Sequence, residues 1–257
     1  MKAIAIRPRE TQSAHVVEIP RPEPKKNEVL VKILETGICG TDAEINSGLY
    51  GDAPPGEKIL VLGHEVLGQL DNGDLVVPMV RRPCGRCRHC LGGSQDMCDS
   101  GQFTERGIKG VHGGLTEYFA EDPSMLIAIP AAARSYAVLL EPMSVVAKGL
   151  RHALLIQRRL DWSPKRALVL GAGPIGLLAT LTLRVLGWEV TTAARKPTGS
   201  QKAKIAESSG AKYHSVVERP LLELARGGSS FGFIFEATGS AQAAFDSIHC
   251  VAINGVL

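Results

Sequence analysis

A glycine turn between an apolar strand and an apolar helix constrains the fold of this 257-residue chain more than any other feature. Residues 166–170 (Arg-Ala-Leu-Val-Leu) have a buried-strand pattern, Gly-Ala-Gly-Pro-Ile-Gly follows at once, and a helix is expected over 177–186. In such a turn Gly171 changes the chain direction, Gly173 lets the backbone approach a pyrophosphate, and Gly176 lets helix pack on strand. The sequence therefore predicts a nucleotide-binding turn.

Strands and helices continue to alternate after this turn. Strands are expected over 188–193, near Tyr213 and over 231–235, with a helix over 201–209. This alternation is typical of a doubly wound parallel sheet of the Rossmann type. Thr238 falls in the loop after one of these strands, where such a sheet binds its dinucleotide.

The residues after the second strand bear on the choice of nucleotide. Where an NAD-binding protein would place an acid for the ribose 2′-hydroxyl, this chain has Ala194, Arg195 and Lys196. Two cations attract a 2′-phosphate, so the sequence favours NADP and leaves NAD as an alternative. The other interpretation is a pair of solvated surface cations.

Four cysteines with short gaps predict a metal-binding loop in the first half. Cys84, Cys87, Cys90 and Cys98 have C-x2-C-x2-C-x7-C spacing, which brings four thiolates to one tetrahedral Zn²⁺. Four protein sulfurs fill the zinc shell, so this zinc is expected to be structural. Two disulfides are the alternative, and His89 within the loop is interpreted as a solvent-facing residue.

Short strands punctuated by glycine and proline precede and follow this loop. They are expected over 2–7, 16–19, 28–34, 59–66, 73–78 and 111–120. This pattern favours a barrel-like β domain. The first helical pattern appears over 137–156.

Four residues of this half suggest a second metal site. Glycines flank Cys39, and a glycine turn presents His64 and Glu65 after an apolar run. Cysteine and histidine are suitable zinc ligands, and Glu65 adds a carboxylate. Glu141 is a carboxylate in an apolar segment, and a helix-start acid is its alternative interpretation. A lone histidine after a strand is more often structural, but its pairing with Cys39 favours a ligand.

Composition excludes several classes of function. The net charge is +3 and the basic residues are scattered, so neither a nucleic-acid surface nor RNA binding is expected. No apolar run reaches membrane-spanning length, and residues 1–7 are too short and too soon charged for a signal peptide. Clustered thiols with Cys39 and Cys250 left over indicate a reducing compartment, and a cytoplasmic location is expected.

The motifs together resemble the zinc-dependent medium-chain alcohol dehydrogenase family. The resemblance rests on Gly-Ile-Cys-Gly-Thr-Asp (37–42), Gly-His-Glu (63–65), the four-cysteine loop and Gly-Ala-Gly-Pro-Ile-Gly (171–176). Within the family, the chain resembles the archaeal glucose 1-dehydrogenase branch. The similar segments are 1–4, 77–82, 105–108, 141–142 and 236–239.

The resemblance implies an α/β fold with two domains. A GroES-like β-barrel catalytic domain would span residues 1–150, with its structural zinc lobe at 84–98. A Rossmann domain that binds NADP would span 151–257, with the active site in the cleft between the two.

The resemblance also implies roles for single residues. A catalytic zinc would be held by Cys39, His64 and a carboxylate, with Glu141 or Glu65 as the third group. Thr41 and Glu105 match positions that touch the sugar. The NADP contacts would come from Gly173, Pro174, Ile175, Gly176, Ala194, Arg195 and Lys196. The expected reaction oxidises an aldose, with D-glucose favoured, at C1; hydride passes to NADP and Thr41 takes the hydroxyl proton.

Two departures from the family pattern stand out. Glu44 occupies the position of a relay histidine in many alcohol dehydrogenases. The chain also ends at Leu257 in the expected fifth strand, so a C-terminally truncated form that lacks the last strand is expected. An inactive zinc- and nucleotide-binding fragment is therefore one alternative, and a dehydrogenase of another polyol, alcohol or threonine is a second. The family forms dimers and tetramers, so a homo-oligomer is expected for the full-length form.

Overall fold

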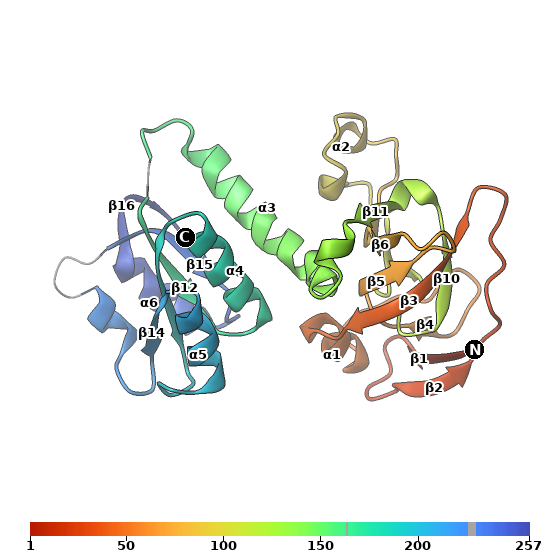
Figure 1. Cartoon of the computed structure of the whole chain (residues 1–257), viewed down its shortest axis with the longest axis horizontal. Helices are drawn as coiled ribbons and strands as arrows, with labels where there is room; N and C mark the ends of the chain where they lie inside the picture. The colour runs from red at the N-terminus through yellow and green to blue at the C-terminus, as the bar shows by residue number, and fades with distance from the viewer. Residues whose placement is uncertain (163, 226–229) are drawn as a thin grey trace. The chain divides into compact units, whose positions relative to one another are not determined.

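The computed structural model describes residues 1–162, 164–225 and 230–257. The chain folds into two compact units, Met1–Glu141 and Pro142–Leu257. The domain boundary expected after residue 150 falls within helix α3 (Leu140–Gln157). Each unit has its own sheets and its own core (Figure 1).

The first unit is built mainly of short strands. Its strands are β1 (Lys2–Ile6), β2 (His15–Glu18), β3 (Val29–Gly37), β4 (Leu60–Val61), β5 (Glu65–Gln69), β6 (Leu75–Pro78), β7 (Arg81–Arg82), β8 (Thr104–Arg106), β9 (Gly110–Val111), β10 (Tyr118–Glu121) and β11 (Leu126–Ile129). Its helical segments are α1 (Gly40–Asn46), α2 (Arg88–Leu91), η1 (Gln95–Met97), η2 (Pro123–Met125), η3 (Ala131–Ala133) and η4 (Ala137–Leu139).

Sheets curl around apolar side chains in this unit. The described strands form the orders β2-β1-β4, β10-β3-β5-β6-β11 and β7-β8-β9. Val31, Val66, Val76 and Phe119 pack inside the five-stranded sheet. The barrel-like β domain is thereby confirmed.

A glycine explains one difference from the expected strands. The run over 59–66 was expected as one strand-turn element, and it forms β4 and β5 with a turn between them. Gly63 in this turn has φ +91, and a Cβ there would lie 2.9 Å from the backbone nitrogen of Leu115. The strand therefore ends at Val61, and β5 begins directly after His64.

The second unit is a parallel sheet covered by helices. Its strands are β12 (Arg166–Leu170), β13 (Glu189–Ala194), β14 (Lys212–Ser215), β15 (Phe231–Glu236) and β16 (Val251–Val256). Its helical segments after α3 are α4 (Pro174–Val185), α5 (Gln201–Ser208), η5 (Leu221–Leu224), α6 (Ala241–Ser247) and η6 (Ile248–Cys250).

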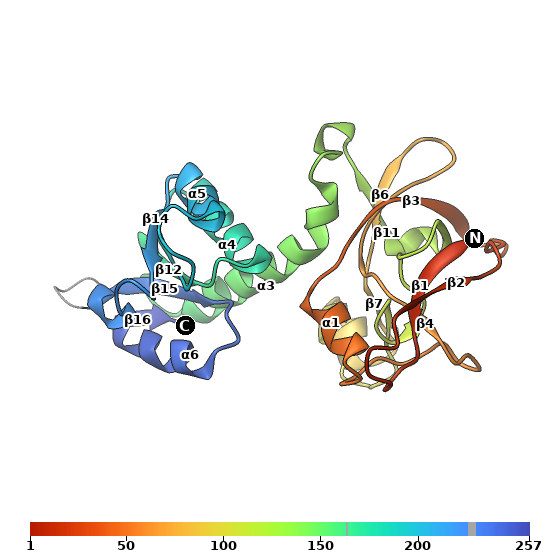
Figure 2. The ribbon, with the colours of Figure 1, turned by 90° about the horizontal axis from the view of Figure 1, so that it is seen from below.

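Strand order confirms the doubly wound sheet. Among the described residues the order is β14-β13-β12-β15-β16, and every pairing is parallel. In chain order this is 3-2-1-4-5, the arrangement of a Rossmann dinucleotide-binding fold. Figure 2 shows α4 and α5 on one side of the sheet and α6 on the other.

Alternate residues of β12 explain why both faces are covered. Ala167 and Val169 pack with α3 and α4, whereas Leu168 and Leu170 pack on the opposite face. A strand buried on both faces reads as a continuous apolar run, as this one does. Helix α4 begins at Pro174 rather than at the expected residue 177, because proline fits the first helical position.

Candidate active site and metal centres

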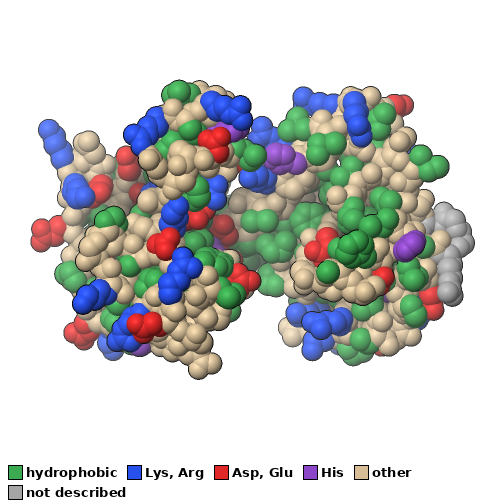
Figure 3. Space-filling model, turned by 180° about the vertical axis from the view of Figure 1, so that it is seen from behind, with side chains coloured by type: hydrophobic (Ala, Val, Ile, Leu, Met, Phe, Trp, Pro, Cys, Tyr) green, Lys and Arg blue, Asp and Glu red, His purple; other side chains and the backbone are tan. Residues whose placement is uncertain are grey.

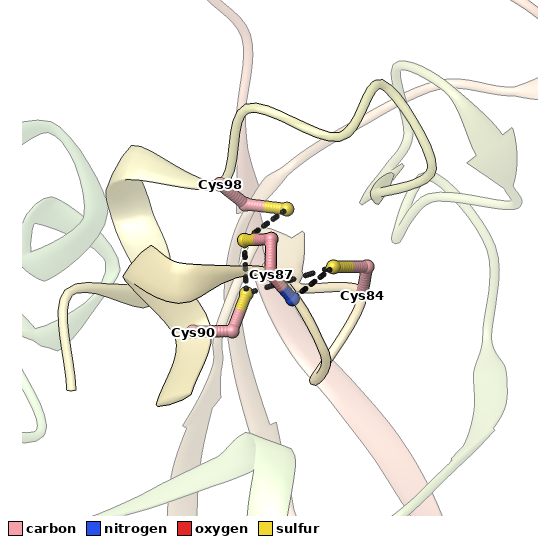
Figure 4. A group of neighbouring side chains, drawn as sticks. All are labelled: Cys84, Cys87, Cys90 and Cys98. Carbon is pink, nitrogen blue, oxygen red and sulfur yellow. Dashed lines mark hydrogen bonds between the residues drawn. The ribbon is translucent and has the colours of Figure 1, made fainter. Parts of the chain in front are cut away.

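The four-cysteine loop gathers its sulfur atoms around one point. The Sγ–Sγ distances are 3.8 Å for Cys84 to Cys90, 3.4 Å for Cys87 to Cys90 and 3.9 Å for Cys87 to Cys98 (Figure 4). Zinc bound to four sulfurs at about 2.3 Å would set neighbouring sulfurs roughly 3.8 Å apart. All six cysteines of the chain are free thiols, so the loop has the geometry of a zinc site rather than of two disulfides.

The four thiols of this loop differ in acidity. The Ser100 hydroxyl and backbone amides lower the pKa of Cys84 to about 6, whereas burial and neighbouring thiols raise the pKa of Cys90 to about 12. Thiolates this close repel one another, so they ionise together only around a cation. His89 instead lies 3.3 Å from Asp99 through Nε2, outside the sulfur cluster.

A second cluster forms where α1 begins and β5 begins. Cys39 precedes the first residue of α1, and its Sγ lies 3.2 Å from Nε2 of His64. A sulfur and a nitrogen that share a zinc ion would lie about 3.5 Å apart. His64 is buried, and its Nδ1 has no hydrogen-bond partner among the described residues. The donor set therefore fits a metal ion, and the ligand roles stay a prediction.

Asp42 belongs to this cluster and was not among the predicted site residues. It is 3% exposed, and its carboxylate accepts hydrogen bonds from the backbone amides of Cys39 (3.0 Å) and Gly63 (3.2 Å). Its Oδ1 also lies 3.7 Å from Nδ1 of His64. The sequence signal is a capping spacing, with an acid three residues after the residue that precedes the helix. Asp42 thus ties the cysteine turn to the histidine turn.

Two glutamates lie close to His64: its neighbour Glu65, at the start of β5, and Glu141 of α3. Ligand atoms of His64, Glu65 and Glu141 all lie within 4.8 Å of one another. Burial raises the pKa of Glu141; Glu65 and Asp42 raise it further, while His64 lowers it. Glu141 also lies in the first turn of α3, which agrees with its alternative interpretation as an acid at the start of a helix. A cation in this cluster would favour the ionised carboxylate.

Thr41 lies beside the cysteine in α1. Burial raises the pKa of the Cys39 thiol, and the neighbouring Thr41 hydroxyl lowers it in part. Burial also raises the pKa of Tyr50, and the Thr41 hydroxyl lowers it in part. The Tyr50 hydroxyl donates to Oε2 of Glu44 at 3.0 Å, so the relay-histidine position holds a carboxylate with a hydroxyl partner.

Glu105 lies on β8 and is held by an arginine. Nε and Nη2 of Arg81 donate to its Oε1 at 2.9 and 2.7 Å. Two residues further, a Cβ on Gly107 would lie 2.6 Å from the Gly63 carbonyl, so this loop packs on the turn before His64.

The second unit contains a pocket of about 680 Å³ at the ends of its strands. Among the predicted cofactor residues, its lining includes Gly171, Gly173, Ala194, Arg195, Lys196 and Thr238. Lys202 of α5 also lines it and was not predicted. Pro174, Ile175 and Gly176 form the first turn of α4.

The glycine turn has the close contacts that its pattern predicts. Gly171 has φ +102, and a Cβ on Gly176 would lie 2.0 Å from the Gly171 carbonyl oxygen. A Cβ on Gly173 would meet nothing within 4 Å, so this residue leaves space on the pocket side. The turn and helix thus leave room for a phosphate group at the start of α4.

Comparison with known proteins agrees with both units. Residues 25–131 match the family described as "Alcohol dehydrogenase GroES-like domain", and residues 134–257 match "Glucose dehydrogenase C-terminus". The whole chain is 48% identical to a glucose 1-dehydrogenase of Methanocella arvoryzae and covers 75% of that protein. The chain belongs to the zinc-dependent medium-chain alcohol dehydrogenase family, in its glucose 1-dehydrogenase branch.

Solved structures of this dehydrogenase family have the same fold. Haloferax mediterranei glucose dehydrogenase, in complex with NADP, Zn and gluconolactone, is 36% identical with a TM-score of 0.90. The match covers 99% of this chain and 75% of that one. Galactitol-1-phosphate dehydrogenase from Escherichia coli is 26% identical with a TM-score of 0.81, over 98% of this chain and 72% of that one.

Helix character and surface charge bear on membrane and nucleic-acid binding. Among the described helices, none combines the length and apolar character needed to cross a membrane. On the face shown in Figure 3, lysine and arginine side chains are scattered among acidic and apolar ones.

Proposed function

We propose that this dehydrogenase oxidises an aldose at C1, with D-glucose as the favoured substrate and NADP as the hydride acceptor. The observation that carries the proposal is the donor cluster around His64, in a chain 48% identical to a glucose 1-dehydrogenase. Further support comes from the Haloferax complex, which contains gluconolactone, the product of glucose oxidation at C1.

The proposed catalytic zinc site uses residues from three separate parts of the chain. Cys39 and His64 would hold the ion with Glu141, and Glu65 is the alternate carboxylate. Zinc, when bound, supplies Lewis acidity that lowers the pKa of a hydroxyl group beside it. Asp42 would keep the cysteine and histidine turns in register through its two backbone hydrogen bonds.

Thr41 would take the proton that leaves the C1 hydroxyl. A hydroxyl can accept one proton while it donates another, so Thr41 can pass a proton on to Tyr50. Tyr50 already donates to the exposed carboxylate of Glu44, which gives the proton a short route toward solvent. Glu105 would orient the sugar ring.

NADP is the proposed cofactor, and it accepts the hydride when bound. The pocket of the second unit would hold its pyrophosphate near Gly173 and its 2′-phosphate near Arg195 and Lys196. Ala194 leaves no acid to repel that phosphate. We further propose a cytoplasmic location, because both zinc sites need reduced thiols. We also propose that the protein forms a homo-oligomer, as members of the family do.

The test is a substrate panel with the zinc-loaded chain, scored by absorbance of the reduced cofactor. Aldoses, polyols, secondary alcohols and threonine are each tried with NADP and with NAD. We expect the highest kcat/KM for D-glucose with NADP. The likeness to galactitol-1-phosphate dehydrogenase supports a polyol as the second candidate, and a preference for any polyol over every aldose would replace the proposal with it.

A further inference from the structure

Arg81 makes contacts in three directions at once. Its Nε and Nη2 donate to Oε1 of Glu105, and its Nη1 donates to the carbonyl oxygen of Asp96 at 3.1 Å. Its guanidinium also lies 4.1 Å from the centre of the Phe103 ring. Asp96 lies in the cysteine loop, between Cys90 and Cys98. Arg81 therefore connects the four-cysteine loop to the carboxylate that is proposed to touch the sugar.

The hydrogen bonds leave one oxygen of Glu105 available. Among the described residues, both bonds from Arg81 go to Oε1 and no donor reaches Oε2. The Glu105 side chain is 19% exposed, so Oε2 can accept a hydrogen bond from a hydroxyl group of a ligand. Two N–H groups of one planar guanidinium fix the position of Oε1, whereas a lysine ammonium supplies only a point charge.

The strands beneath this pair are held rigidly. Arg81 and Glu105 are opposite partners in the β7–β8 pairing. The next residues, Arg82 and Arg106, both pair with Glu121 of β10, which is 5% exposed. The strands thus give Arg81 and Glu105 a fixed separation, and the cysteine loop supplies the remaining restraint on Arg81.

We propose that Arg81 is a positioning residue that orients Glu105 toward the sugar and makes sugar affinity depend on the structural zinc loop. This inference rests on the proposed function, because Glu105 must touch the substrate for its orientation to matter. Arg81 itself touches no reacting atom. Its loss should therefore raise KM for the sugar, while KM for NADP changes little.

The experiment compares Arg81→Gln and Arg81→Lys with the matched control Lys109→Gln. The Lys109 ammonium lies 4.2 Å from the centre of the same Phe103 ring and donates to the Gly101 carbonyl. Among the described residues, no hydrogen bond or ion pair joins this ammonium to Glu105. We expect KM for D-glucose to rise about tenfold or more in Arg81→Gln, with only partial recovery in Arg81→Lys. Lys109→Gln should match wild type. Full recovery by lysine would overturn the positioning role, because charge alone would then suffice.

The link to the zinc loop is tested with Cys98→Ser, which removes a ligand, and Cys98→His, which keeps a zinc-ligating side chain in case the serine variant fails to fold. Calorimetric titration with D-glucose in the presence of NADP gives the affinity without turnover, and zinc content is measured on the same samples. We expect D-glucose binding to weaken with the zinc that is lost, so Cys98→Ser should weaken it more than Cys98→His. In a variant that has lost this zinc, Arg81→Gln should weaken binding by less than a further twofold. If the losses of D-glucose affinity caused by Arg81→Gln and by loss of the structural zinc instead multiply, the link between Arg81 and the zinc loop is overturned.

Failure of this inference is distinguishable from failure of the proposed function. A wild-type chain that binds and oxidises no aldose would overturn both. Equal affinity of wild type and Arg81→Gln for D-glucose would overturn the inference alone. Should Arg81→Gln lose its structural zinc, Arg81→Lys carries the test, because it keeps a donor for the Asp96 carbonyl.

Discussion

At the scale of single residues, a few side chains around His64 each contact several neighbours. His64 lies 3.2 Å from the Cys39 sulfur on one side and near Glu65 and Glu141 on another. Asp42 holds the backbone on both sides of that pair. The cluster has one sulfur, one imidazole and several carboxylates, a mixed set that zinc accepts.

Replacing Cys39 by serine should abolish turnover and leave one zinc per chain. The hydroxyl is a poor zinc ligand, whereas the loop of four cysteines keeps all its sulfurs. Metal analysis and steady-state kinetics on the purified variant check this, with Cys250→Ala as the matched control that should keep both ions. Full activity in Cys39→Ser would contradict the catalytic-zinc assignment.

Replacing Arg195 or Lys196 by alanine should weaken NADP and spare NAD. Each cation would form a charge-assisted bond to the 2′-phosphate, so each loss should raise KM for NADP roughly tenfold. Lys204→Ala is the control, because this exposed lysine lies on α5 but does not line the pocket. An equal rise in KM for NAD and for NADP would show that the two cations do not recognise the 2′-phosphate.

At the scale of elements, the glycine turn shows how much local sequence predicts. Gly171 and Gly176 lie five positions apart, and their roles follow from the strand before and the helix after. The sulfur cluster is also local, because its ligands lie within one loop. In contrast, Asp42 meets Gly63 across 21 residues and Arg81 meets Glu105 across 24. Such pairs depend on how strands and turns pack together, which residue spacing does not reveal.

Two alanine substitutions in the turn should have different effects. Gly176→Ala places a methyl group 2.0 Å from the Gly171 carbonyl, so the turn must shift, and stability should fall by about 1–3 kcal/mol. Gly173→Ala meets nothing within 4 Å, so the chain should keep its stability but bind NADP more weakly. Thermal unfolding and NADP titration of both variants separate the two effects. Equal stability of both would refute the packing role of Gly176.

The buried carboxylate of Glu121 should be important for the strands that carry Arg81 and Glu105. Glu121→Gln would leave two arginines without their counter-charge, and Arg106 is 3% exposed. Breaking a buried pair in this way typically costs about 3–5 kcal/mol. Denaturant unfolding measures the loss, and the exposed Glu23→Gln provides a control that should stay within about 0.5 kcal/mol. A near-neutral Glu121→Gln would show that the pairs contribute little.

At the scale of the whole molecule, the alternation of elements predicts the second unit well. Every strand expected there is present, and the sheet order follows from the doubly wound pattern. The first unit was predicted as a barrel-like domain, but its strand pairings were not. Antiparallel strands such as β3 and β10 pair across long stretches of chain, and their register depends on packing as well as on local pattern. The ligand and substrate roles remain predictions for experiment.

The proposed reaction transfers a hydride from C1 of an aldose to NADP. The most direct measurement uses D-glucose deuterated at C1, the zinc-loaded chain and NADP, followed by mass spectrometry of the cofactor and the sugar product. Hydride transfer from C1 would place deuterium in the reduced cofactor and leave none at C1 of the lactone. Reduced cofactor that carries no deuterium, or a sugar oxidised at another carbon, would contradict it.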